Sequence, residues 1–275
     1  KCIMYSEEDY EKALHYLDLA LDAFAKEGDK PYLEGRIYFD KTVYHYHLEA
    51  YAPAFECVQK AQQLSLQTKD MRTVALAYNL EGAILKRQKI YKKATALYKK
   101  AIDICTAYCS DKALASILHL NMGDNYLFAK QYDAALQCFN IAHDLVKSTK
   151  DKGVLSLVYC SFVEVYFELG DYDQADEYVD KILPLMKDRD ATHIDLEYLR
   201  FLLIRARIAF HKEDEEALFK ICNEGIEVAE KTNKYHRLKE FHFILANYYD
   251  KIGDREKFIQ ETGRMYFVEK MQKQG

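Results

Sequence analysis

The chain has 275 residues, of which only 10 are Gly, 3 are Pro and none is Trp, whereas Tyr occurs 23 times. Sandwiches, barrels and dinucleotide-binding sheets need many turns, which consume Gly and Pro. This composition argues against them and favours a long all-helical protein. The net charge of -5 gives no general attraction to nucleic acid or to an anionic membrane. No run of 18 apolar residues occurs, so no membrane-spanning helix is expected.

The first residues and the cysteines both bear on where the protein is located. The start, KCIMYSEEDYEKAL, has charged residues where a signal peptide needs an apolar stretch. The seven Cys are odd in number and scattered, which favours small core residues in a reducing compartment over a disulfide framework. These features predict a cytoplasmic protein.

One phrase recurs along the chain: an aromatic residue, two residues, Ala, three residues, a bulky apolar residue, two residues, Ala. Copies begin at Tyr10, Tyr51, Tyr91 and Tyr132, with a weaker copy at Tyr172. The small residue returns every 40 to 42 residues, at Ala13, Ala54, Ala94, Ala135, Ala175 and Ala217, and a degenerate copy has Phe258 at this place. A fixed period of this length indicates a repeat architecture.

The other half of each repeat lies upstream of the phrase. Gly82 precedes Ala94 by twelve residues, and Gly123 precedes Ala135 by the same distance. Two antiparallel helices approach closely only where one offers Gly or Ala at the crossing, so each repeat is predicted to be a helical pair. The turns FAKQYD and ELGDYD place a polar residue just before the second helix, where it can cap free N–H groups.

This pattern resembles the tetratricopeptide repeat (TPR) over essentially the whole chain, and most strongly over 75–109 and 116–149. The match weakens at Val163, where Gly or Ala is usual, and beyond Leu196. The resemblance implies an all-α fold, a right-handed TPR superhelix of about six to seven helical pairs. We expect a single solenoid domain over residues 1–275, and a fragment of a longer protein, since the first repeat would begin before Lys1.

Repeats of about 40 residues, longer than the common 34, are typical of bacterial signalling proteins. The resemblance therefore implies a sensory or regulatory domain that binds a protein, a peptide or a small-molecule signal in a concave groove, for example ahead of a diguanylate cyclase output domain. The alternative is a passive protein–protein interaction scaffold or dimerisation module. A homodimer stays open, and neither nucleic acid nor membrane is expected as a partner.

Catalytic signatures are absent from the sequence. It contains no GxxxxGK[ST], GxGxxG, GxSxG or HExxH, so we expect no enzyme activity in this chain, no catalytic residue and no cofactor. Cys105 and Cys109 lie on one helix face and, with His119 nearby in sequence, raise the question of a metal. Zinc sites usually need four ligands and the fourth is not evident, so two core thiols and no metal are favoured.

Two runs of like charge are candidate docking patches. Residues 86–100 hold seven basic and no acidic residues, and residues 171–180 hold five acidic and no basic ones. Solvated outer helix faces are favoured for both over a patch for an acidic partner or for subunit pairing.

In the resembled family, the first helix of each pair lines the groove. Aromatic side chains there offer stacking area, while Asn and Arg bind a peptide backbone or a carboxylate. Asn79 is the best single candidate, because Asn has a low helix propensity and its presence inside a helix is not explained by helix formation. The Lys and Asn set of a chaperone-type carboxylate clamp is not recognisable. The residues expected to face the groove are Arg36, Phe39, Tyr46, Asn79, Lys86, Arg87, Leu120, Asp124, Phe128, Glu164, Phe167 and Asn247.

Overall fold

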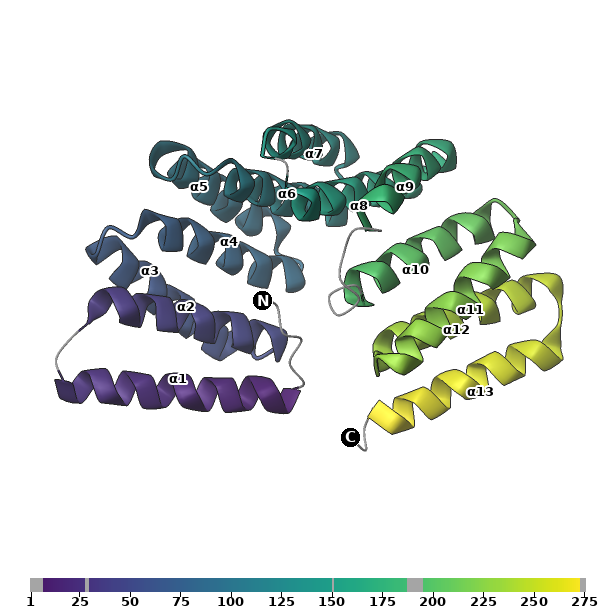
Figure 1. Cartoon of the computed structure of the whole chain (residues 1–275), viewed down its shortest axis with the longest axis horizontal. Coiled ribbons are helices and arrows are strands. Elements are labelled where there is room, and N and C mark those ends of the chain that lie inside the picture. Colours follow the sequence, from purple (N-terminus) through teal and green to yellow (C-terminus); the bar gives the residue numbers. More distant parts are fainter. Residues whose placement is uncertain (1–6, 28–29, 150, 187–194, 273–275) are drawn as a thin grey trace. The chain divides into compact units, whose positions relative to one another are not determined.

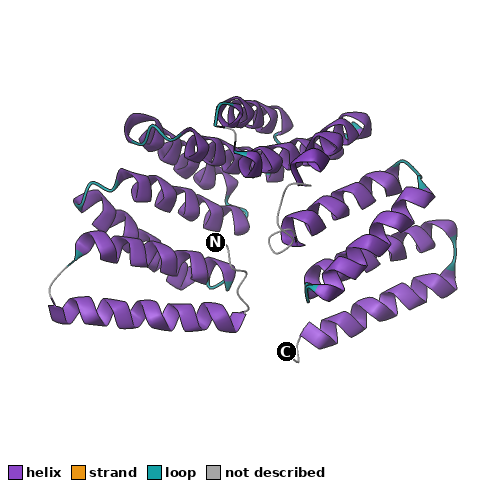
Figure 2. Ribbon diagram, viewed as in Figure 1, coloured by secondary structure: helices purple, strands orange, loops and turns teal. Residues whose placement is uncertain are grey.

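The computed structural model describes residues 7–27, 30–149, 151–186 and 195–272. Over these residues it contains thirteen helices and no strand (Figures 1 and 2). The helices are α1 (Glu7–Glu27), α2 (Pro31–His47), α3 (Tyr51–Gln67), α4 (Met71–Arg87), α5 (Tyr91–Tyr108), α6 (Lys112–Phe128), α7 (Tyr132–Lys147), α8 (Lys152–Leu169), α9 (Tyr172–Met186), α10 (Asp195–His211), α11 (Glu215–Lys231), α12 (Tyr235–Ile252) and α13 (Arg255–Gln272). The predicted all-α repeat architecture is confirmed.

The helices alternate between two structural roles. We call α2, α4, α6, α8, α10 and α12 the A helices. The helix that follows each of them is a B helix, so the B helices are α3, α5, α7, α9, α11 and α13. A and B helices of a pair pack together, as α4 does on α5, and consecutive A helices also touch, as α2 does on α4 and α10 on α12. The helix α1 carries the Tyr10 copy of the repeated phrase, which belongs to a B helix.

The chain divides into two compact units, residues 1–158 and residues 159–275, with the division inside α8. Unit 1 contains α1 to α7, and unit 2 contains α9 to α13 with most of α8. Each has a core of its own: Val74, Cys105 and Leu118 belong to that of unit 1, and Leu202 and Phe241 to that of unit 2. The single domain expected from the sequence stays a prediction.

Glycine occupies the predicted crossings between helices. A Cβ atom on Gly82 would lie 3.0 Å from Cε1 of Tyr98, and one on Gly123 would lie 2.4 Å from Cε1 of Phe139. Real Cβ atoms do not tolerate the shorter distance, so the aromatic ring of each B helix fills the space that a side chain would take. The steric reason inferred from the repeat spacing is confirmed at both positions.

The turns explain why the sequence needs so little glycine. In the described ranges, nine connections between helices contain a residue with positive φ, and only two of these nine residues are Gly, namely Gly170 and Gly253. The other seven are Glu49, Lys69, Lys89, Ser110, Lys130, Glu213 and Asn233. Backbone hydrogen bonds close these turns: the N–H of Ile90 donates to the C=O of Leu85 at 2.9 Å, which is the Schellman arrangement.

Helix capping agrees with the sequence in one turn and not in another. The Asp171 carboxylate accepts a hydrogen bond from the N–H of Gln174 at 3.1 Å, as predicted for ELGDYD. The prediction for FAKQYD is wrong, since Gln131 makes no side-chain cap. An amide side chain one methylene longer than that of Asn is outside the group of good N-cap residues.

The position of the small residue also shifts in α11. The fourth residue of α5 and of α7 is the fully buried Ala94 or Ala135. In α11 the fourth residue is Leu218, which is 1% exposed, whereas Ala217 is only partly buried. Ala217 therefore lies one position before the place that Ala94 and Ala135 occupy, and a large residue, Leu218, fills that place in α11.

Candidate functional site

The predicted groove residues lie on the A helices. We call their shared surface the A-helix face: in unit 1 it is formed by α2, α4 and α6, and in unit 2 by residues 159–169 of α8 with α10 and α12. The structure brings some of these side chains together and separates others.

In unit 1, five predicted residues form a connected group across three helices. The Arg87 guanidinium donates a hydrogen bond from Nε to the hydroxyl of Tyr46 at 3.2 Å. The Lys86 ammonium lies 4.0 Å from the Asp124 carboxylate and 5.4 Å from the ring centre of Phe128. Phe128 itself is 61% exposed. This arrangement joins α2 to α4 and α4 to α6, and it leaves one aromatic ring accessible.

The favoured candidate, Asn79, is engaged by the next repeat. The side-chain amide of Asn121 donates to Oδ1 of Asn79 at 2.9 Å, so Asn79 links α4 to α6. Arg36 is exposed and donates to the hydroxyl of Tyr32 on its own helix at 3.4 Å. Phe39 is partly buried, and Leu120 is buried. Leu120 therefore belongs to the core, and its expected place in the groove was wrong.

A hydroxyl group lies buried beside the unit 1 group. The Tyr98 side chain is fully buried, and its hydroxyl has no hydrogen-bond partner among the described residues. Burial raises the pKa of Tyr98, and Tyr46 and Asp124 raise it further. The phenol therefore stays protonated, and its side chain lies near Tyr46 and Asp124.

In unit 2, a cavity of about 280 Å³ opens on the A-helix face. Two predicted residues line it, Phe167 of α8 and Asn247 of α12. The third, Glu164, instead accepts a hydrogen bond from Nε of Arg200 at 2.9 Å and joins α8 to α10. The other residues that line the cavity are Arg207, Phe210, His211, Glu240, Phe243 and Ile244.

These six lining residues were not found from the sequence. The repeat pattern weakens beyond Leu196, so no register was available from which to assign inward positions on α10 and α12. Ala206 and Ala246 are buried, and each is the twelfth residue of its helix, as Gly82 is of α4. Counting from these two residues would have supplied the missing register. The ring of His211 lies 5.2 Å from that of Phe167, and Phe243 is 53% exposed. The cavity is therefore rich in aromatic surface beside one guanidinium.

The cysteine pair considered for metal binding lies at the end of α5. Cys105 is 1% exposed and packs in the core, while Cys109 is partly exposed. Burial, and then the neighbouring Cys109, raise the pKa of Cys105 to about 11, so it is a thiol at neutral pH. Within the described ranges, no three His, Cys, Asp or Glu side chains gather as a metal site would require.

The acidic run over residues 171–180 is partly neutralised. The Lys212 ammonium lies 3.3 Å from the Asp173 carboxylate and also pairs with Asp176. In the basic run, the Lys100 ammonium lies 4.0 Å from the ring centre of Tyr78. These contacts are mostly exposed, and such pairs contribute little to stability.

Stacked helical pairs with a polar and aromatic A-helix face define an α-solenoid, an architecture that offers extended binding surfaces. In the described part of the chain, no helix is both long and apolar enough to cross a membrane. The particular repeat is the tetratricopeptide repeat, whose family model matches residues 73–148 and 113–188. The chain thus carries tetratricopeptide repeats in this segment, as its sequence pattern predicted.

Individual proteins of known type are also similar to this chain. It is 25% identical over 190 residues to the 43 kDa receptor-associated protein of the synapse from Tetronarce californica, a match that covers 66% of this chain and 45% of that protein. The chain therefore spans less than half the length of this relative. The apo form of RapI has a TM-score of 0.75 at 13% identity, covering 97% of this chain and 94% of its own. A Rap protein complexed with competence and sporulation factor has a TM-score of 0.72 at 14% identity, covering 96% and 71%. At these identities the two structures show a shared fold.

Proposed function

We propose that this chain is a sensory or regulatory domain whose A-helix face binds a peptide or an extended protein segment. The observation that carries the proposal is the cavity on the A-helix face of unit 2. Its volume of about 280 Å³ is just below the usual range of 300–1,000 Å³ for pockets that enclose a small-molecule ligand. It suits one apolar side chain of a longer ligand, with Arg207 and Asn247 beside it for the polar backbone or a carboxylate.

Signalling would follow from the contacts between neighbouring A helices. A ligand that binds more tightly to one arrangement of these helices than to another shifts the population toward the first. The Rap structure complexed with a factor, which has a similar fold, supports a ligand-binding role. In its finer form the proposal makes the chain the cytoplasmic, non-enzymatic sensor of a bacterial signalling protein, ahead of an output domain such as a diguanylate cyclase.

The alternative is a passive scaffold or dimerisation module. The exposed apolar side chains of α13 favour it, since Ile259, Tyr266 and Phe267 are 67%, 63% and 63% exposed. Apolar groups gathered on one helix can mark a protein interface.

The test is a selection of displayed random heptapeptides against the chain, with the enriched sequences synthesised and their affinity measured by calorimetry. Phe243→Ala and Arg207→Ala remove cavity groups, and Tyr108→Ala removes a similarly exposed ring from α5 as the control. The proposal expects affinity to fall by about tenfold or more in both cavity variants and to be unchanged in the control. No enriched peptide, together with a stable dimer in light scattering, would favour the scaffold.

A further inference from the structure

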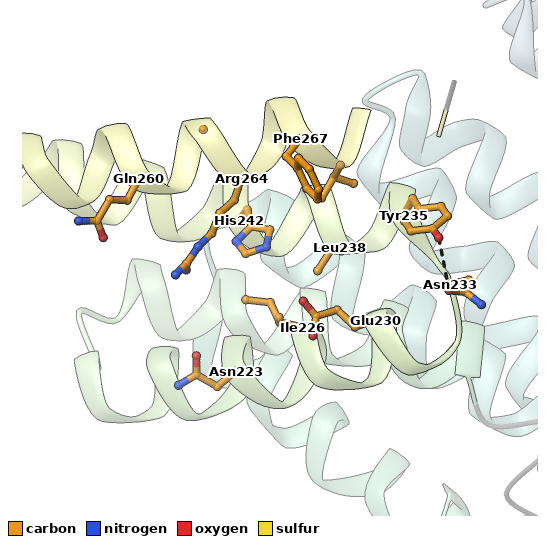
Figure 3. A pocket seen from close by; sticks show the side chains of 12 residues that line it. Asn223, Ile226, Glu230, Asn233, Tyr235, Leu238, His242, Gln260, Arg264 and Phe267 are labelled. Atoms are coloured by element: carbon orange, nitrogen blue, oxygen red, sulfur yellow. Dashed lines mark hydrogen bonds between the residues drawn. The ribbon is translucent and has the colours of Figure 1, made fainter. Parts of the chain in front are cut away.

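A second and larger cavity, of about 940 Å³, lies in unit 2 on the other side of α12 from the A-helix face. Figure 3 shows α13 along one wall, with Arg264 and Phe267, and residues of α11, including Ile226 and Glu230, along the other. The buried His242 of α12 forms part of its floor. Its volume falls within the range of pockets that enclose small ligands.

The cavity coincides with two departures from the repeat, and the first is a buried acid. Glu261 is the seventh residue of α13 and is 5% exposed. The seventh residues of the other B helices are Cys57, Leu97, Cys138, Tyr178 and Ile221. None of these is charged, so packing between A and B helices does not require a carboxylate at this place.

The buried acid holds two cavity residues in position. Nδ1 of His242 lies 2.6 Å from Oε2 of Glu261, and the Arg264 guanidinium donates to Oε1 of Glu261 at 2.6 Å. A buried ion pair often contributes no more stability than apolar residues of similar size would. Whatever it adds to stability, the group fixes the positions of His242 and Arg264 at the cavity wall.

The second departure is Gly263, the ninth residue of α13. The ninth residues of α5, α7, α9 and α11 are Lys99, Asn140, Asp180 and Asn223. Gly inside a helix costs about 1 kcal/mol relative to Ala, yet nothing lies within 4 Å of where a Cβ of Gly263 would be. No close approach of another helix calls for glycine here. Its effect is to leave the α13 wall of the cavity open.

The charges around the cavity indicate the sign of its ligand. Arg264 is paired with Glu261, whereas Glu230 forms no ion pair with any residue that the structure describes. Glu230 is thus the carboxylate that lines the cavity, and the guanidinium of Arg264 is already paired with Glu261, which is not among the lining residues. Because the guanidinium is paired and the Glu230 carboxylate is not, the cavity offers its unpaired charge to a cation rather than to an anion.

We propose that this cavity is a second binding site, for an organic ammonium ion with an apolar body. The ammonium group pairs with the Glu230 carboxylate on the α11 wall, and the ring of Phe267 on the α13 wall offers a face that attracts cations. The apolar body lies against Ile226 and Leu238. This site shares no lining residue with the cavity on the A-helix face, so its test is independent of the function proposed above.

The experiment titrates the chain in a calorimeter with three probes that share a phenylethyl group: phenethylamine, its neutral N-acetyl derivative, and 3-phenylpropionate. Phenethylamine alone is expected to bind. To separate a free amine from a peptide amino terminus, Phe-Gly-Gly amide and its N-acetylated form are titrated as well. Binding of the acid as tightly as the amine would overturn the proposal.

Two variants and one control locate the site. Glu230→Gln keeps the shape and removes the charge, and it is expected to weaken phenethylamine binding about tenfold. Gly263→Leu fills the open wall and is expected to abolish binding without lowering Tm, because Leu favours the helix. Glu227→Gln, three residues earlier on α11 and paired with Lys231 outside the cavity, is the control. Unchanged affinity in either cavity variant would refute the site. A change of molecular mass in light scattering on Gly263→Leu would assign the cavity to a second copy of the chain instead.

Discussion

The same substitution, Gly to Ala, is expected to have opposite effects at two positions of unit 2. A Cβ on Gly225 would lie 2.2 Å from Cζ of Phe241 and within 2.6 Å of two further ring atoms, whereas one on Gly263 would meet nothing within 4 Å. Phe241 is fully buried and cannot turn outward. The two variants share the helix-forming advantage of Ala and differ only in steric space.

The magnitudes follow from these distances. Ala in place of Gly inside a helix contributes about 1 kcal/mol, so Gly263→Ala should be stabilising by about that amount, or about 2–4 °C in Tm. At Gly225 the added methyl group overpacks the core, which costs about 1–3 kcal/mol, with the short contact placing it near the upper value. The net effect of Gly225→Ala is then destabilisation by about 2 kcal/mol.

Thermal and urea denaturation followed by circular dichroism would measure both effects. A double variant that adds Phe241→Leu removes the clashing ring atoms, so its loss of stability should be smaller than the sum of the losses from the single variants. If Gly225→Ala were as stabilising as Gly263→Ala, the steric account of the helix crossing would be refuted.

Three further predictions concern unit 1 and the turn after α8. Lys130 and Gly170 both have positive φ, which favours Gly. Lys130→Gly should therefore be neutral or stabilising by up to about 1 kcal/mol, whereas Gly170→Ala should be destabilising by about 1 kcal/mol, and thermal melting would measure both. A backbone N–H of α6 and then the Arg72 guanidinium lower the pKa of Asp111. The ionised carboxylate therefore contributes to folding stability above the unfolded-state pKa near 4, and this contribution is lost as the pH falls through the lowered pKa. Urea titrations at pH 6 and pH 3 should show that Asp111→Asn loses less stability on acidification than the unsubstituted chain does. Since the pKa of Cys105 is raised to about 11, iodoacetamide at pH 8 should modify it far more slowly than in urea, and equal rates would contradict its burial.

The sequence by itself determined the helical pairs, their period and the crossings at Gly82 and Gly123. These features are local: a helix end, a turn and a small residue each depend on neighbours within one repeat, and repetition makes them readable. The same register selected Phe167 and Asn247, which the structure places at one cavity. It also placed Leu120 on the surface, although that side chain is buried. Periodicity shows which face of a helix a residue lies on, but not how completely the neighbouring helices cover that face.

Only the tertiary structure decided which side chains meet across helices and where space is left open. His242 and Glu261 are nineteen residues apart and on different helices. The repeat pattern marks Glu261 as a charged residue at a usually uncharged position, but it does not show that the two side chains are buried together. Likewise, the sequence shows Gly263 as an unusual residue inside a helix, and only the structure shows that it lines a cavity. The physical reason is that a cavity depends on the distance between packed helices, which is set by all the side chains between them and is not encoded in the period of any one helix.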